Sequence, residues 1–555
     1  MAPSPLVIRS ALLKPLSAFS VVQKGGFAYF RDLLAHTDPI IAVGAWCALF
    51  DSKLMQRVLA RQVIPYCRYG AVRSRAFAYF RSVHEHDLAR GAAEVAAEGT
   101  SDPEQAAMLA ELEHDNAGAA AASGRLYLAT ADLAHLRTAS EQAEREGGWR
   151  PALEWALRSV VVSPLNPAPL FRLFEVLDGA AQADLLKEVA DVLLARNLHL
   201  RIAQLFLAAA ASARGQPQLC LTQLKPLDDV KVAANPALSI YLGAIRALRA
   251  LSEERLGNYR KSYESYRALN AAERALNVDP SFVYKGADIR GKLAIPALPP
   301  DGQPDVIQML GFPRSGTTLL ENALAAHPAI ETFEETAALN VATDRIEGVL
   351  FGHAPAGSLE EVFLKARAGY FDEIRSLRRK LEAGVLIDKL PIRTADTAFI
   401  TKLFPEWRYI FSIRHPYDVV LSCFKQRFVP NPAMENFHTI EDASRLYDFA
   451  MTEWFKVHTM DDPKVIYVRY DDLVTDFDRV TGGVLDFLGL PWDDAVRDFS
   501  KAAENRAAKT PSYQKVRQGL SIGVQTQWRN YGFVFQSEAA KPLRKWVEFF
   551  GYPLE

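Results

Sequence analysis

A short glycine-bearing loop between an apolar run and a helical stretch constrains the fold of this chain most. Val306–Leu310 predicts a buried strand, and Leu319–Leu324 predicts the start of a helix. In such a turn, backbone N–H groups and the positive end of the helix dipole point at one spot, which suits a phosphate. The residues that would line this spot are Arg314, Ser315, Gly316, Thr317 and Thr318. The sequence therefore predicts an α/β domain with an anion site here.

The loop departs from the common nucleotide-binding P-loop at one position. Gly311 and Gly316 have the P-loop spacing, but Thr317 stands where that loop has an obligatory lysine. The lysine serves the β and γ phosphates beside Mg²⁺, so its absence disfavours an ATPase or a kinase. Arg314 inside the loop suits a nucleotide with one 5′-phosphate. A tight structural turn is the alternative interpretation.

Further apolar runs predict that this domain is a parallel sheet. The runs 385–387, 409–413 and 465–468 are bounded by turn residues and alternate with helical stretches, which is typical of βαβ units. A proline-rich connector, Ile295–Gly302, cannot continue a helix and precedes the first strand. We therefore predict an α/β domain over residues 296–555, with the boundary after residue 295.

Residues 1–295 predict an all-α domain. The segment is rich in Ala, Leu, Arg and Glu, and apolar residues recur every three or four positions. Gly148–Pro164 and Leu256–Pro280 resemble the tetratricopeptide repeat, and a generic helical array fits equally well. By analogy with repeat arrays, this domain would bind an acceptor or partner, or form a homodimer.

The net charge, the cysteine spacing and the apolar stretches give no support for a nucleic-acid-binding, metal-binding or membrane-spanning protein. The formal net charge is −2, which gives no global electrostatic argument for nucleic acid as a partner. The four cysteines show no metal-ligand or redox spacing, so we expect reduced thiols and no metal. The apolar stretch Ile40–Phe50 is too short to cross a bilayer, and Lys14 interrupts what would be a signal core. We expect a cytoplasmic protein without a transmembrane segment.

Two motifs resemble the sulfotransferase family. Residues 313–318, PRSGTT, resemble its 5′-phosphosulfate loop, and residues 411–422 resemble its 3′-phosphate motif, in which Arg414 and Ser422 hold the phosphate-binding positions. The resemblance covers most of residues 304–532. It implies transfer of a sulfuryl group from 3′-phosphoadenosine-5′-phosphosulfate to a hydroxyl of a glycan, a peptide tyrosine or a small molecule.

The position of Arg414 agrees with this resemblance, because ligands gather at the carboxyl ends of parallel strands. A helix cap with a surface salt bridge is the alternative interpretation. His415 departs from the family, which often has Asp or Asn before the proline.

The same resemblance implies a catalytic set. Glu335 matches the general base of tyrosylprotein sulfotransferases, while Glu331 and Glu334 are predicted to lie in a solvated helix turn. Lys389 would stabilise the leaving group. Asp388 would orient this lysine or form a surface ion pair.

Three further residues are assigned by resemblance. Tyr470 would contact the nucleotide, although a strand-end tyrosine often only packs. Ser512 would donate near the transferring group and Arg517 would meet a phosphate, unless this segment is a solvated basic loop. Two other functions stay open: a P-loop small-molecule kinase, and a helical scaffold with a non-catalytic nucleotide-binding domain.

Overall fold

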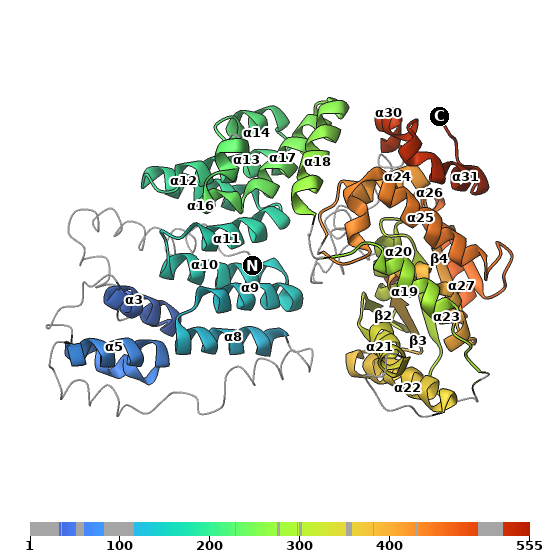
Figure 1. Ribbon diagram of the computed structural model, residues 1–555, viewed down its shortest axis with the longest axis horizontal. Coiled ribbons are helices and arrows are strands. Elements are labelled where there is room, and N and C mark those ends of the chain that lie inside the picture. The colour runs from blue at the N-terminus through green and yellow to red at the C-terminus, as the bar shows by residue number, and fades with distance from the viewer. Residues whose placement is uncertain are drawn as a thin grey trace. The chain divides into compact units, whose positions relative to one another are not determined.

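The computed structural model describes residues 33–34, 36–51, 60–82, 116–227, 229–274, 278–296, 298, 302–350, 358–380, 382–428, 430–497 and 526–555. The chain divides into two compact units, Met1–Ser265 and Tyr266–Glu555 (Figure 1).

The described part of the first unit is helical. Its longer helices are α3 (Pro39–Asp51), α5 (Gly70–Ser82), α8 (Asn116–Thr130), α9 (Leu133–Gly147), α10 (Trp149–Val162), α11 (Pro167–Gly179), α12 (Ala183–Ala195), α13 (Leu200–Ala213), α14 (Pro217–Leu224) and α17 (Leu242–Arg255). Sequence neighbours such as α9 and α10, or α12 and α13, pack against each other. Alanines including Ala156 and Ala209 are fully buried, which lets these helices approach closely. The prediction of a helical N-terminal region is confirmed, and the tetratricopeptide repeat stays a prediction.

The second unit contains a parallel sheet, as predicted, and the sheet has a fifth strand, β2, that is not among the four predicted runs. Its strands are β1 (Val306–Gly311), β2 (Ile330–Glu334), β3 (Val385–Lys389), β4 (Tyr409–Ile413) and β5 (Val465–Arg469). The order is β2-β3-β1-β4-β5, so the central strand β1 lies between β3 and β4. The chain winds from β1 to one edge and later to the other, which makes the carboxyl end of β1 the topological switch point where ligands bind in such sheets.

Helices cover both faces of this sheet. On one face Ile307 and Met309 of β1 join a buried cluster with α20 (Thr317–Ala326) and α27 (Phe477–Leu488). On the other face Gln308 reaches α22 (Leu359–Leu377), and Phe411 of β4 stacks on Trp454 of α25 (Ile440–Phe455). Alternate residues of one strand therefore face different helices. Further helices of this unit are α21 (Ala338–Leu350), α23 (Thr397–Leu403), α24 (Pro416–Phe424), α26 (Tyr470–Thr475), α30 (Gly532–Phe535) and α31 (Lys541–Phe549).

One helix before the predicted boundary packs with the α/β unit. Helix α19 (Phe282–Gly291) contacts α23 and the 3₁₀ turn η3 (Pro391–Asp396). Its Arg290 lies 2.6 Å from Asp396 and 2.8 Å from Glu347. Packing thus joins α19 to the sheet, whereas the prediction used only the proline-rich connector that follows it. Whether residues 1–295 and 296–555 are separate domains stays a prediction.

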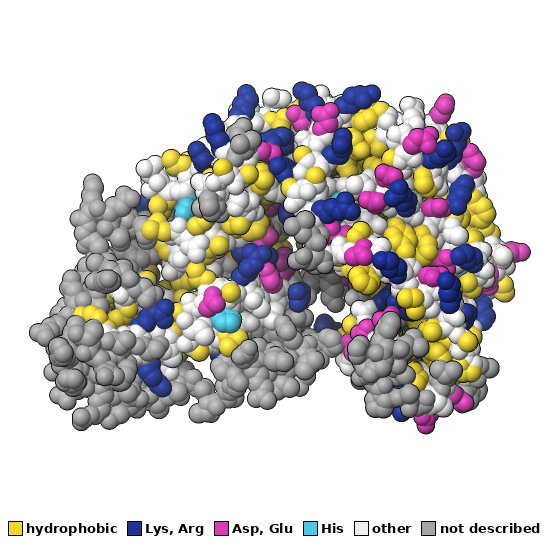
Figure 2. Space-filling view, viewed as in Figure 1, with side chains coloured by type: hydrophobic (Ala, Val, Ile, Leu, Met, Phe, Trp, Pro, Cys, Tyr) yellow, Lys and Arg dark blue, Asp and Glu magenta, His cyan; other side chains and the backbone are white. Residues whose placement is uncertain are grey.

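The face of the second unit seen in Figure 2 carries interspersed basic and acidic side chains. This distribution is in keeping with the formal net charge of −2. Among the residues that the structure describes, no helix is long and apolar enough to cross a membrane.

Candidate active site

The loop after β1 has the backbone conformation that its glycines permit. Gly311 has φ +142° and Gly316 has φ +100°, and a Cβ on Gly316 would lie 2.4 Å from Cδ2 of Tyr470. Helix α20 begins directly after the loop, with Thr317 and Thr318 in its first turn. The hydroxyl of Ser315 is buried and has no hydrogen-bond partner among the described residues. A phosphate or sulfate oxygen at this helix N-terminus would fit that hydroxyl.

Arg314 connects this loop to the second motif. Its backbone φ is +73°, and its Nε donates a hydrogen bond of 3.0 Å to Oγ of Ser422 on α24. Arg414, directly after β4, donates to the carbonyl of Arg314 at 3.3 Å. The guanidinium of Arg414 also lies 4.7 Å from the centre of the Tyr470 ring. The structure therefore brings both predicted phosphate sites into one cluster.

The positive charges of Arg314 and Arg414 in this cluster repel each other. Burial lowers the pKa of Arg314, Cys423 opposes this effect, and the nearby Arg414 cation adds a smaller lowering. Two arginines held close together in a buried place favour an anion between or beside them.

His415 begins helix α24. Its Nδ1 accepts from the backbone N–H of Tyr417 at 3.2 Å, and its Nε2 lies 2.9 Å from the carbonyl oxygen of Pro553. Burial lowers the pKa of His415 to about 4, so the ring is neutral at pH 7 and its Nε2–H donates to Pro553. The ring also stacks on Trp528 at 4.7 Å. His415 thus caps the helix as an Asp or Asn would, and it fixes the C-terminal segment beside Arg414.

Lys389 lies at the centre of a carboxylate cluster. Its Nζ is 3.0 Å from Oε1 of Glu334, 3.3 Å from Oε2 of Glu321 and 3.4 Å from Oε1 of Glu335. The lysine side chain is 0% exposed. Burial alone would lower its pKa, but the three carboxylates outweigh this effect and raise the pKa above the usual value. Lys389 is therefore a cation at every pH at which the protein would work.

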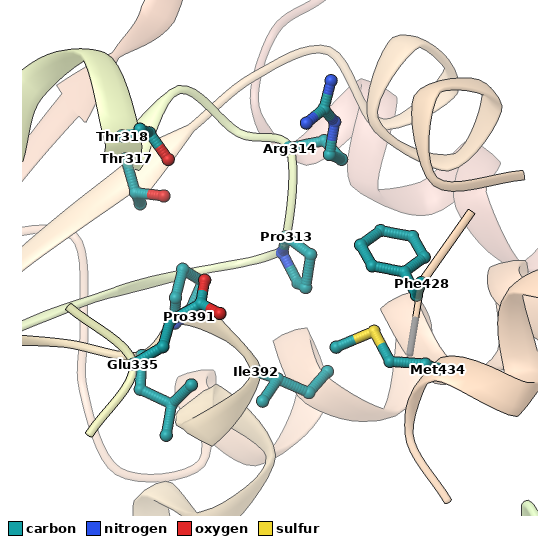
Figure 3. A pocket seen from close by; sticks show the side chains of 10 residues that line it. Pro313, Arg314, Thr317, Thr318, Glu335, Pro391, Ile392, Phe428 and Met434 are labelled. Atoms are coloured by element: carbon teal, nitrogen blue, oxygen red, sulfur yellow. The ribbon is translucent and has the colours of Figure 1, made fainter. Parts of the chain in front are cut away.

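Glu335 differs from the other two carboxylates in backbone and exposure. Its φ is +49°, a left-handed conformation that is strained in glutamate, and its N–H donates to the carbonyl of Lys389 at 2.9 Å. Its side chain is 46% exposed. Figure 3 shows the Glu335 carboxylate pointing toward the loop of Pro313. The Arg314 side chain extends from this loop in the direction away from Glu335.

A cleft of about 510 Å³ of empty space, open solvent included, lies against these groups. Its polar wall is formed by Arg314, Thr317, Thr318 and Glu335. Its apolar wall is formed by Pro313, Leu390, Pro391, Ile392, Phe428 and Met434 (Figure 3). A half-exposed carboxylate and the loop before α20 thus share one cleft with an apolar surface.

Comparison with known proteins agrees with this geometry. The model of the family described as "Sulfotransferase family" matches residues 305–494, from the first strand to beyond the fifth.

Residues 305–494 form a sulfotransferase-family domain.

Relatives match parts of this region. An uncharacterized protein of Aquifex aeolicus (strain VF5) is 28% identical over 40% of this chain and 30% of its own length. Protein-tyrosine sulfotransferase 1 of Danio rerio is 27% identical over 34% of this chain and 53% of its own length. The chain thus spans about half or less of these relatives. The solved sulfotransferase domain of the Synechococcus PCC 7002 olefin synthase has a TM-score of 0.36 and 23% identity, covering 47% of this chain and 100% of that domain.

The structure of the sulfotransferase domain corrects three predictions. Asp388 neither orients Lys389 nor forms a surface ion pair, because neighbouring residues of β3 face opposite sides of the sheet. It is buried and accepts from the hydroxyl of Tyr370 at 2.9 Å. Glu331 and Glu334 lie in strand β2 and not in a solvated helix turn. Glu331 is buried and accepts from the backbone N–H of Lys380 at 3.0 Å.

The sequence prediction gave Glu334 no part in the site and did not name Glu321, and two predicted site residues cannot be placed. Glu334 faces Lys389 because the two are direct neighbours in the pairing of β2 with β3. Glu321 reaches the same ammonium from α20, and its signal was a carboxylate inside an otherwise apolar helical stretch. Ser512 and Arg517 lie outside the described residues.

Proposed function

We propose that the sulfotransferase domain is an enzyme that transfers a sulfuryl group from 3′-phosphoadenosine-5′-phosphosulfate to an acceptor hydroxyl. The observation that carries this proposal is the contact between the two phosphate motifs, where Arg314 donates to Ser422 and accepts from Arg414. Two separate anion sites at one switch point match a donor with phosphates at both its 5′ and 3′ positions.

Different residues of the chain would bind the 5′ and 3′ groups of the donor. The loop N–H groups, Ser315, Thr317 and Thr318 would hold the 5′-phosphosulfate at the N-terminus of α20. Arg414 and Ser422 would hold the 3′-phosphate, and Arg314 lies between the two groups.

The segment outside the described residues completes this assignment by resemblance. Arg517 would contact a phosphate there, and Ser512 would donate near the transferring group. Tyr470 packs against Gly316 and Arg414 and would keep the loop in place below the nucleotide.

The bound donor supplies the sulfuryl group, and the residues around Lys389 supply the proton transfer and the charge. Glu335 would take the proton of the acceptor hydroxyl as the new S–O bond forms and the S–O bond to the 5′-phosphate breaks. Lys389, Arg314 and Ser512 would stabilise the negative charge that the leaving phosphate gains. Glu335 suits the role of base because its half-exposed carboxylate faces the cleft.

The cleft favours one of the acceptor classes that the sequence left open. Leu390, Ile392, Phe428 and Met434 form an apolar wall beside the base, and the relatives include protein-tyrosine sulfotransferases. An aromatic ring would bury apolar surface against this wall, whereas the many hydroxyls of a glycan would lose hydration there. We therefore propose a peptide tyrosine as acceptor ahead of a glycan.

Calorimetric titration with 3′-phosphoadenosine-5′-phosphate in EDTA tests the donor site. We expect metal-free binding in the full chain, loss of binding in Arg314→Ala and Arg414→Ala, and normal binding in Arg479→Ala, whose exposed arginine lies on α27. Absence of binding, or binding only of ATP with Mg²⁺, would refute the proposal and favour a kinase.

An acceptor screen with tyrosine peptides and glycans then tests turnover, with Glu335→Gln as the variant expected to bind nucleotide without activity. Nucleotide binding without turnover on any hydroxyl would favour the scaffold function.

A further inference from the structure

Lys389 has three carboxylate neighbours, and they come from two places in the chain. Glu321 lies on α20, one helical turn after Thr317, while Glu334 is the last residue of β2 and Glu335 follows it directly. All three carboxylates are within 3.4 Å of the ammonium nitrogen. Two of these contacts are hydrogen bonds, which Nζ donates to Glu334 and to Glu335, and the contact with Glu321 is an ion pair.

Exposure separates these carboxylates into two kinds. The side chains of Glu321 and Glu334 are 3% and 8% exposed, whereas that of Glu335 is 46% exposed. A buried carboxylate has no water to replace its cation, so Glu321 and Glu334 remain with Lys389. Glu335 loses little when it turns from the ammonium, because water or an acceptor hydroxyl can hydrogen-bond to it.

We propose that Glu321 and Glu334 are positioning residues that hold the Lys389 ammonium in place, while Glu335 exchanges this ammonium for the acceptor hydroxyl. The inference rests on the proposed sulfuryl transfer. When Glu335 turns to the acceptor, one N–H of Lys389 becomes available to the oxygen that links sulfur to phosphate. The roles of Glu335 and Lys389 are thereby coupled. When the contact between them breaks, Glu335 becomes free to accept the proton of the acceptor and Lys389 becomes free to donate to the leaving group.

Charge supports this division of roles. The charged groups that face Lys389 from α20 and β2 are these three glutamates, and its neighbour Asp388 faces Tyr370 on the other side of the sheet. Burial without partners would favour a neutral lysine, which can neither donate three hydrogen bonds nor stabilise an anion. After Glu335 has turned away, the two buried carboxylates keep the lysine protonated.

The test uses isosteric substitutions in the full chain. Glu321→Gln and Glu334→Gln keep the size and one acceptor oxygen of each side chain but remove its charge. Glu331→Gln is the matched control, since Glu331 is a buried glutamate of the same strand β2 that faces away from Lys389. Glu321→Asp restores the charge of the first variant.

Two measurements are made on each variant. The first is a pH titration of the Lys389 ammonium signal by ¹⁵N NMR in nucleotide-free protein, assigned by its loss in Lys389→Met. We expect the wild-type signal to persist to pH 10, and the titration to move down by about one pH unit or more in each Gln variant. The second is kcat together with the Kd of 3′-phosphoadenosine-5′-phosphate, where we expect kcat to fall at least about tenfold and Kd to change less than about twofold.

The results separate this inference from the proposed function. A lysine titration that is the same in both Gln variants and in Glu331→Gln would overturn the inference, even with intact turnover in the wild type. A fall in kcat that Glu321→Asp does not relieve would also overturn it. Absence of nucleotide binding by the wild type would instead overturn the sulfotransferase proposal, and the NMR titration would still report on the lysine cluster.

Discussion

Replacing Gly316 by alanine is the substitution whose effect the structure defines most sharply. Gly316 has φ +100°, which side chains rarely adopt, and the added Cβ would lie 2.4 Å from Cδ2 and 3.1 Å from Cε2 of Tyr470. The Tyr470 ring cannot simply move away, because it is also held under the guanidinium of Arg414. The alanine therefore strains the backbone and displaces a residue of the second motif at once.

The expected cost follows from these two effects. An alanine forced to this φ costs about 1–3 kcal/mol, and insertion of a methyl group into a packed contact costs about 1–3 kcal/mol. Together they reduce the free energy of unfolding of the second unit by about 2–6 kcal/mol, or lower its Tm by roughly 5–20 °C. We also expect Kd for 3′-phosphoadenosine-5′-phosphate to rise at least about tenfold, because the loop N–H groups lose their alignment.

Differential scanning calorimetry and nucleotide titration measure both effects. The matched control is Gly483→Ala on helix α27, where an added Cβ meets nothing within 4 Å, and we expect it to raise stability by about 0.5–1 kcal/mol. Tyr470→Ala in the Gly316→Ala background should recover part of the lost stability. Gly316→Ala protein with wild-type Tm and wild-type Kd would refute the reasoning.

Three further predictions concern buried ionisable groups. Lys389→Met leaves the buried carboxylates without their cation, so we expect a loss of about 3–5 kcal/mol at pH 7 that shrinks as acid protonates them, measured by thermal unfolding at pH 7 and pH 5; an equal loss at both pH values would contradict this. His415→Ala removes the cap of α24 and should lower the free energy of unfolding by about 1 kcal/mol, whereas His415→Asn should retain most of the wild-type stability. Equal stability of the two variants by calorimetry would contradict the role of His415 as a cap. Burial raises the pKa of Asp388 to about 6. Its favourable contribution to the free energy of unfolding is therefore present below pH 4 and is lost as the pH rises through 6. Unfolding measured from pH 4 to pH 7 should therefore show a smaller loss of stability in Asp388→Asn than in the wild type.

The parts of the prediction that the structure supports depended on local signals. An apolar run, a glycine loop and a helix start within 20 residues specify a strand, a turn and a helix wherever they occur, so β1, the loop and α20 could be read directly. The same holds for Arg414 at the end of β4, since the carboxyl ends of parallel strands meet at one edge. Tandem amphipathic helices likewise follow from periodicity, while their assignment to a repeat class and to a dimer interface stays a prediction.

The residues that the prediction placed wrongly or missed depend on long-range packing. Glu334 meets Lys389 only because of the register between β2 and β3, and a shift of one residue would turn it to the other face. Glu321 joins them because α20 packs on that same face. The neutral state of His415 arises from burial, to which Trp528, more than 100 residues away in the chain, contributes by stacking on the ring.

The sequence by itself thus determined four of the five strands and the two anion motifs, because backbone propensity and turn chemistry act over a few residues. Only the tertiary structure decided which carboxylates surround Lys389, which face Asp388 takes and which charge His415 carries. Burial and ion pairing depend on neighbours that the linear sequence does not place.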